Sequence, residues 1–146
     1  MIVVLPSGIL SESIEDFPKP TDFNVIYGMT SGAALLLDVY RPPNAHGGAL
    51  IFIMGTGCTA YGEYDDVPLK NLDRWLIEVG IFENLYGEKG SYYTGAWEAG
   101  FTVFSINYRL GPVHQWKTQL RDCQRAVQFI RAEHARFGID PGKIAV

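Results

Sequence analysis

The chain has 146 residues, of which 47% are hydrophobic, and this combination fits one globular domain that can bury a sizeable core. The formal net charge is −4 and the twelve Lys and Arg residues are scattered, which argues against a protein that binds nucleic acid or anionic membranes. The N-terminal residues show neither a basic start nor a long apolar run, so no export signal is visible and a cytoplasmic location is favoured.

The predicted strands fall into two groups. The first two apolar stretches are joined by "GMTSG", whose glycines and serine suit a turn, and they predict an antiparallel pair. The later apolar runs are continuous, which is typical of strands covered on both faces. In chain order, the predicted strands are Phe23 to Tyr27, Ala34 to Pro43, Ala49 to Gly55, Phe101 to Tyr108 and Lys143 to Val146, the last one after the turn residues Asp140, Pro141 and Gly142.

Helices are predicted between the later strands. A short helix ends at "AWEAG", and a long helix runs from Trp116 to Phe137, with Gly138 as its C-terminal stop. Alternating spacings of four and three predict that one apolar stripe faces the core, formed by Trp116, Leu120, Cys123, Val127, Ile130, His134 and Phe137. His134 is therefore interpreted as a packed histidine with a local partner. Strand, helix and strand in this order predict an α/β fold in which parallel βαβ units with flanking helices follow the antiparallel first strands.

The stretch from residue 61 to 94 is interpreted as an aromatic-rich insertion within a single domain of residues 1–146. Insertions at the carboxyl end of a strand often carry binding sites, so Tyr61 and Tyr64 are candidate pocket residues, although the aromatic side chains could instead only pack the insertion onto the domain. "NLDRWLIEVGIF" within it has a helical pattern. The acidic residues Glu63, Asp65 and Asp66 are interpreted as a solvated loop, because no other ligand is spaced to complete a metal site.

No metal or cofactor is predicted. Cys58 and Cys123 lie far apart without a Cys-x-x-Cys spacing, and they are interpreted as reduced, buried cysteines. The three histidines are isolated from one another in the sequence.

The most informative short motif is "FIMGTGCTAYG", because glycines directly after a buried strand leave backbone amides free to face a ligand. One interpretation is a dinucleotide site, since the sequence from Gly55 to Ala60 matches Gly-x-Gly-x-x-Ala. That motif also requires a second strand ending in an acidic residue about 20 residues later, whereas "LDRWLIEVG" stands there. The other interpretation is an oxyanion hole, whose amides stabilise the negative oxygen of an attacked acyl carbonyl.

Three longer stretches favour the oxyanion hole. "LLLDVYRPPNAHGGALIFIMGTG", "AWEAGFTVFSINYRLGPVHQW" and "TQLRDCQRAVQFIRAEHARFGIDPGKIAV" together resemble the α/β-hydrolase fold and, within it, the esterase/lipase group related to hormone-sensitive lipase and the bacterial BD-FAE-type esterases. The resemblance covers roughly Val25 to Val146 except the insertion, with the elements in the order of the family.

The resemblance implies the site. The His-Gly-Gly-Gly of the family falls on Met54, Gly55, Thr56 and Gly57, so the amides of Gly55, Thr56 and Gly57 would form part of the oxyanion hole. Two positions depart from the family: Met54 replaces the histidine that usually braces the loop, and Thr56 replaces a glycine. Arg109 is expected to be a structural hydrogen-bonding partner, and His114 could approach the site entrance.

In this family "IAV" leads into the nucleophile elbow Gly-x-Ser-x-Gly, and the catalytic acid and histidine follow it. The chain stops before all three, and none of its six serines, Ser7, Ser11, Ser13, Ser31, Ser91 and Ser105, has glycines at the required spacing. We therefore expect an N-terminal half of a serine esterase, inactive and poorly stable alone, whose partner is the remaining C-terminal half on the same or a second chain, or a second copy of itself. The alternative is a non-catalytic domain that binds a ligand or a protein.

Overall fold

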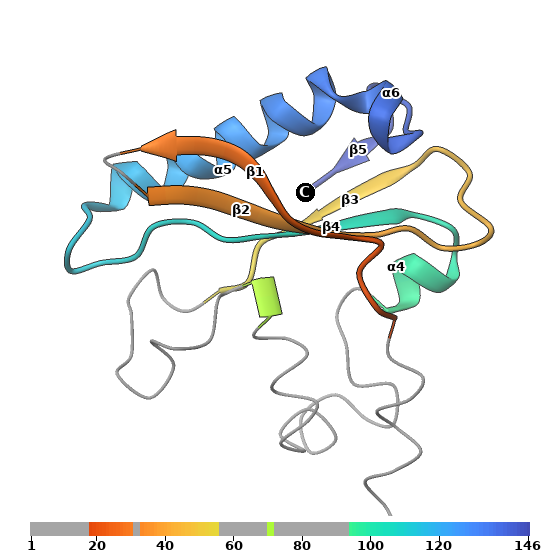
Figure 1. The fold of residues 1–146 in the computed structure, drawn as a ribbon, viewed down its shortest axis with the longest axis horizontal. Coiled ribbons are helices and arrows are strands. Elements are labelled where there is room, and N and C mark those ends of the chain that lie inside the picture. Colours follow the sequence, from red (N-terminus) through yellow and green to blue (C-terminus); the bar gives the residue numbers. More distant parts are fainter. Residues whose placement is uncertain (1–17, 31–32, 56–69, 72–93) are drawn as a thin grey trace, which may run out of the picture.

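The computed structural model describes residues 18–30, 33–55, 70–71 and 94–146, and these form a mixed α/β structure (Figure 1). The strands are β1 (Asp22–Thr30), β2 (Ala33–Tyr40), β3 (Ala49–Phe52), β4 (Thr102–Ile106) and β5 (Ile144–Ala145). The helices are α4 (Thr94–Glu98), α5 (Trp116–Ala132) and α6 (His134–Phe137). The α/β fold predicted from the sequence is thus confirmed, with each predicted strand found in its place.

The strands form one sheet in the order β1-β2-β4-β3-β5. β1 pairs with β2, and β2 with β4, in antiparallel orientation, whereas β4, β3 and β5 are parallel to one another. This is the predicted arrangement of an antiparallel start followed by parallel strands. The parallel strands are connected through α4 and α5, as βαβ units require.

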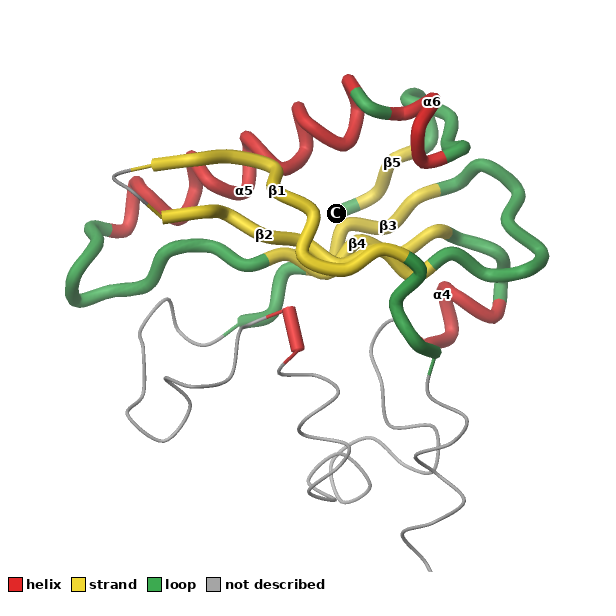
Figure 2. Tube along the Cα trace, viewed as in Figure 1, coloured by secondary structure: helices red, strands yellow, loops and turns green. Residues whose placement is uncertain are grey.

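Helices cover both faces of the sheet (Figures 1 and 2). α5 and α6 lie on one face and α4 lies on the other. Because side chains alternate along a strand, β4 contributes to both layers. Its Phe104 joins the larger core, which includes Leu37, Ile51, Ile130 and Phe137. Its Val103 packs with Tyr40 in a smaller cluster, against which Ala96 and Trp97 of α4 pack.

The long helix differs from the prediction in two ways. It ends at Ala132, and α6 follows as a separate short helix whose C-cap, Gly138, has a φ of 65°. The core-facing stripe is also rotated: Trp116 is 67% exposed and Leu120 49% exposed, whereas Gln119 and Asp122 are buried. The predicted apolar stripe was therefore wrong over the first two turns of α5, because polar contacts with neighbouring loops turn Gln119 and Asp122 inward. His134 is half-buried and its Nδ1 lies 3.1 Å from the carbonyl oxygen of Arg131, which confirms the local partner.

The turn before β5 also has the predicted chemistry. Asp140 Oδ1 accepts a 2.8 Å hydrogen bond from the amide of Gly142, and the carbonyl oxygen of Asp140 accepts one from the amide of Lys143. This Asx-type turn directs the chain back to β3, where the amide of Ala49 donates to the carbonyl oxygen of Lys143 over 2.9 Å. β5 is thereby placed at the outer edge of the described sheet, next to β3.

Candidate active site

The parallel strands β3 and β4 end at the same edge of the sheet, which is where open α/β sheets bind their ligands. The residues that follow β3 in the described structure are Ile53, Met54 and Gly55, and we call Met54 and Gly55 the post-β3 turn. Asn107, Tyr108 and Arg109 follow β4, and we call them the post-β4 loop. These two segments contain the described part of the predicted oxyanion loop and its neighbours.

One hydrogen bond joins the two segments. The Tyr108 hydroxyl donates to the main-chain oxygen of Met54 over 2.7 Å, and both residues are buried. The Met54 side chain is buried, while Gly55, the next residue, is exposed, and apart from its chain neighbours no described residue lies within 4 Å of the place where a Cβ atom would stand. In this turn a buried, hydrogen-bonded residue, Met54, is therefore followed directly by an exposed residue, Gly55.

Asn107 is held from three sides. Its amide donates to the carbonyl oxygen of Leu36 on β2 over 2.9 Å, and its Oδ1 accepts a 2.7 Å hydrogen bond from the amide of Lys70. Its main-chain oxygen accepts a hydrogen bond from the hydroxyl of Tyr27 on β1. The pKa of Tyr27 is raised well above its ordinary value by burial and, secondarily, by the negative charge of Asp122. Tyr27 is accordingly a protonated donor at neutral pH.

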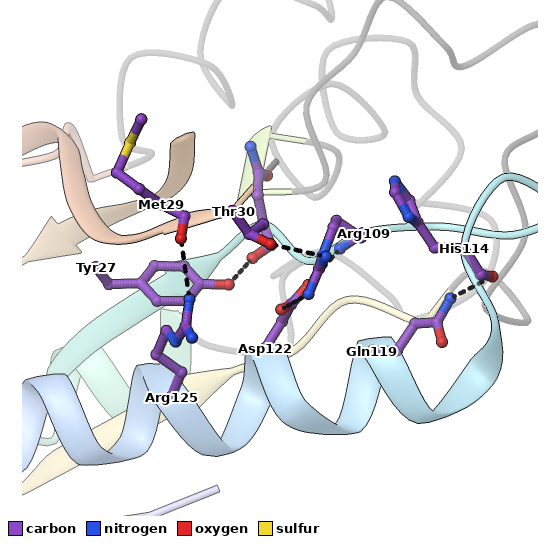
Figure 3. A network of polar contacts seen from close by, with 9 residues as sticks. Tyr27, Met29, Thr30, Arg109, His114, Gln119, Asp122 and Arg125 are labelled. Atoms are coloured by element: carbon purple, nitrogen blue, oxygen red, sulfur yellow. Dashed lines mark hydrogen bonds and ion pairs between the residues drawn. The ribbon is translucent and has the colours of Figure 1, made fainter. Parts of the chain in front are cut away.

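Arg109 is fixed by a carboxylate on α5 (Figure 3). Its Nε and Nη2 donate to Asp122 over 2.8 and 2.7 Å, its amide donates to the same carboxylate over 3.1 Å, and Nη1 donates to Thr30 Oγ1 over 3.0 Å. The hydrogen bonds to Asp122 raise the pKa of Arg109 above its ordinary value, so its charge is permanent. The predicted structural role of Arg109 is confirmed: the side chain ties β1, the post-β4 loop and α5 together.

A second ion pair lies on the α4 side of the sheet. Lys70 Nζ is 2.6 Å from Asp38 Oδ2, and the two side chains are 4% and 1% exposed. Asp38 Oδ1 also accepts a 2.8 Å hydrogen bond from the amide of Asn24, which has a φ of 50°. Ser105 Oγ donates to the carbonyl oxygen of Lys70 over 2.9 Å. Lys70 is thus attached by both its side chain and its backbone, and this holds one point of the segment between β3 and α4 against β2 and β4.

His114 lies two residues before α5, beyond the post-β4 loop, and it is half-buried. Its amide donates to the carbonyl oxygen of Leu110 over 3.1 Å, and its own carbonyl oxygen accepts a hydrogen bond from Gln119 Nε2 over 3.3 Å (Figure 3). Within residues 18–30, 33–55, 70–71 and 94–146, no ion pair connects His114 with a carboxylate. A pocket role for His114 stays a prediction.

Several predicted residues lie outside the described part of the chain: Thr56, Gly57, Cys58, Tyr61, Glu63, Tyr64, Asp65 and Asp66. The insertion itself is described only at residues 70–71 and 94. Cys123, which was expected to be buried, is half-buried. Among the described residues, no group of three or more His, Cys, Asp or Glu side chains could hold a metal ion. No helix in the described segments is long and apolar enough to span a membrane.

Sequence reasoning missed three of the residues that organise this edge: Tyr108, Asp122 and Lys70. Asp122 lies one residue before Cys123 on the predicted helix, so its position was predictable while its inward orientation was not. Tyr108 directly precedes Arg109, and its aromatic ring at the end of a buried strand was the available signal. Lys70 offered no signal, because its partner Asp38 is 32 residues away in the sequence.

Known proteins resemble this chain in sequence and in fold. Residues 82–146 match the model of the BD-FAE family. A solved structure described as a truncated form of a carbohydrate esterase from gut microbiota is 27% identical and superimposes with a TM-score of 0.58, over 89% of this chain and 39% of that one. The chain has the α/β-hydrolase fold. Its similarity to the BD-FAE family model and to this esterase agrees with the esterase/lipase resemblance of its sequence motifs.

Two further comparisons agree. The α/β-hydrolase chain is 28% identical over 138 residues to a probable carboxylic ester hydrolase, LipM, of Mycobacterium tuberculosis (strain ATCC 25618 / H37Rv), which covers 80% of this chain and 28% of LipM. It shares its fold with Thermogutta terrifontis esterase 2 phosphoramylated by tabun, at 20% identity and a TM-score of 0.57 over 83% of this chain and 39% of that one. The chain thus spans well under half the length of the relatives that it matches.

Proposed function

We propose that this chain contributes the oxyanion-hole side of a serine carboxylesterase. The observation that carries the proposal is the post-β3 turn: an exposed glycine stands at the carboxyl end of a buried parallel strand, next to a main-chain carbonyl held by a tyrosine of the neighbouring strand. Amides at such a turn can donate to a developing oxyanion. The family match supports an ester carbonyl as the group that carries it.

The proposed reaction is acyl transfer in two steps. A serine Oγ attacks the ester carbonyl carbon while a histidine takes the serine proton, and the carbonyl oxygen becomes negative. Amides of Gly55, Thr56 and Gly57, together with the amide that follows the serine, hold that oxygen. The C–O bond to the alcohol then breaks, the alcohol leaves with the proton from histidine, and water hydrolyses the acyl-serine to release the acid.

The serine, the acid and the histidine belong, in this proposal, to a remaining C-terminal half on the same polypeptide or on a second chain, or the chain pairs with a copy of itself. β5 lies at the outer edge of the described sheet. A further parallel strand added beside β5 would cover this edge. The proposed substrate is a small acyl ester, and Tyr61, Tyr64 and His114 are proposed to line its pocket.

The test combines the intact mass of the native purified protein with an assay of p-nitrophenyl acetate hydrolysis on the same sample. We expect turnover only from material that contains a Gly-x-Ser-x-Gly segment, on a heavier chain or on a second polypeptide. The matched control is the 146-residue chain alone, which should give no turnover above background. Turnover by that chain alone, or none by the complete material, would contradict the proposal.

A further inference from the structure

We infer that Tyr108 is a positioning residue for the oxyanion loop, acting through the peptide bond between Met54 and Gly55. This inference rests on the proposed function and names a group that the family resemblance did not assign. Its structural basis is the 2.7 Å hydrogen bond from the Tyr108 hydroxyl to the main-chain oxygen of Met54.

Because of the geometry of the peptide unit, this contact fixes the direction of the Gly55 amide. Among the described residues the Gly111–Pro112 bond is the cis peptide, so the bond between Met54 and Gly55 is trans. In a planar trans peptide the C=O and the following N–H point to opposite sides. With the Met54 oxygen turned toward Tyr108, the Gly55 amide points away from Tyr108. The hydroxyl therefore sets the direction of the first amide in the proposed oxyanion loop.

The post-β3 turn depends on this contact because its own side chains provide little orientation. Gly55 has no side chain, and apart from its chain neighbours no atom of the described residues lies within 4 Å of the position where its Cβ atom would stand. Met54 is buried, yet its thioether is only a weak acceptor and cannot fix the peptide plane by a strong hydrogen bond. A glycine can adopt many backbone angles. Without the tyrosine hydroxyl, the Met54 carbonyl oxygen loses the hydrogen bond that orients this peptide plane.

Tyr108 can act as a rigid support because its neighbours in the chain are themselves fixed. Asn107 is held by Leu36, Lys70 and Tyr27, and Arg109 is held by Asp122 and Thr30. Tyr108 itself is buried. Contacts with β1, β2 and α5 therefore determine the position of the Tyr108 hydroxyl. Its hydrogen bond to the Met54 oxygen in turn determines the orientation of the post-β3 turn.

The test is Tyr108→Phe in the native enzyme that contains this chain and the nucleophile segment, with Tyr40→Phe as the matched control. Each variant removes the hydroxyl of a buried tyrosine, but Tyr40 lies opposite Val103 near the start of β4, at the other end of that strand from the post-β4 loop. We expect Tyr108→Phe to lower kcat about tenfold with KM within about twofold, because a misdirected donor is lost mainly in the transition state. Tyr40→Phe should leave kcat within about twofold.

Two additional measurements separate positioning from stability. Replacing Tyr108 by 4-aminophenylalanine, which retains a donor at the same place, should restore kcat to within about threefold of the unsubstituted enzyme. In protein labelled with ¹⁵N-glycine, the Gly55 amide resonance should shift in Tyr108→Phe and stay in place in Tyr40→Phe. Equal kcat losses in the two phenylalanine variants, or an unchanged kcat in Tyr108→Phe, would overturn the inference while an active parent enzyme upholds the proposed function. An inactive parent enzyme would overturn both.

Discussion

The two strand ends at the candidate site are stabilised in contrasting ways. The post-β4 loop is bound by side chains and backbone from β1, β2, α5 and Lys70. The post-β3 turn has one described side-chain contact to its backbone, from Tyr108. We infer that the two segments have different roles. The post-β4 loop is held by many hydrogen bonds and positions the post-β3 turn, whose exposed backbone is proposed to face a ligand. Local stability of this kind differs between segments of one protein.

The largest expected effect comes from breaking the most buried contact next to the post-β4 loop, the ion pair between Lys70 and Asp38. Lys70→Met removes the cation and leaves a carboxylate that is 1% exposed, so we expect the free energy of unfolding to fall by about 3 to 5 kcal/mol. Chemical denaturation of the native protein measures this.

A double variant sharpens the same test. The double variant Lys70→Met with Asp38→Asn leaves no unpaired buried charge, so it should recover part of the stability that Lys70→Met loses. In a double-mutant cycle we expect a coupling energy between the two residues of at least about 1 kcal/mol. Strictly additive losses would show that the pair is not coupled.

The next largest effect should come from Asp122→Ala, which removes the partner of three hydrogen bonds donated by Arg109. The guanidinium is one-fifth exposed and can regain water, so we expect a loss of about 2 to 3 kcal/mol in the free energy of unfolding. The control is Lys143→Ala, which breaks an exposed ion pair to Asp140 and should change stability by less than about 0.5 kcal/mol. Similar losses in the two variants would mean that burial does not distinguish these ion pairs.

A smaller effect depends on pH. The pKa of Tyr27 is raised in the folded protein above an unfolded value near 10, so the folded state retains the proton longer than the unfolded state does. The contribution of Tyr27 to stability is therefore fully present below about pH 10 and is lost as the pH rises from there toward the folded pKa. Thermal melts between pH 8 and pH 11 should show a steeper decline in the parent protein than in Tyr27→Phe. Parallel curves would contradict the raised pKa.

The smallest effect of a substitution on stability is expected at Gly55, in the exposed post-β3 turn. Gly55→Ala meets no atom of the described residues within 4 Å of the added Cβ, apart from its chain neighbours, so the free energy of unfolding should change by less than about 1 kcal/mol. In contrast, Gly100→Ala would place its Cβ 2.9 Å from the carbonyl oxygen of Asn44 at a φ of 95°, and it should cost more. Differential scanning calorimetry of both variants checks the order. A larger loss at Gly55 would show that the post-β3 turn is packed rather than open.

The sequence by itself determined the elements of this protein and their chain order. Continuous apolar runs predicted β3 and β4, the Asp140 turn predicted where β5 begins, and Gly138 predicted the end of the helical region, all of which the structure confirms. These features depend on residues close together in the chain, whose backbone preferences act locally. The motifs also indicated the esterase group, and Arg109 was predicted as a structural residue for a chemical reason, its inability to act as a base.

Only the tertiary structure decided which side chains meet at the candidate site. Met54 and Tyr108 are 54 residues apart, and Lys70 and Asp38 are 32 apart, so no periodicity relates them. The rotation of α5 has the same origin: apolar spacing favoured Trp116 and Leu120 as core residues, but Asp122 turned inward to meet Arg109. A buried ion pair must satisfy its donors and acceptors wherever they lie in the chain. At the end of α5 nearest the site, this requirement decides which side chains are buried, and the apolar spacing does not.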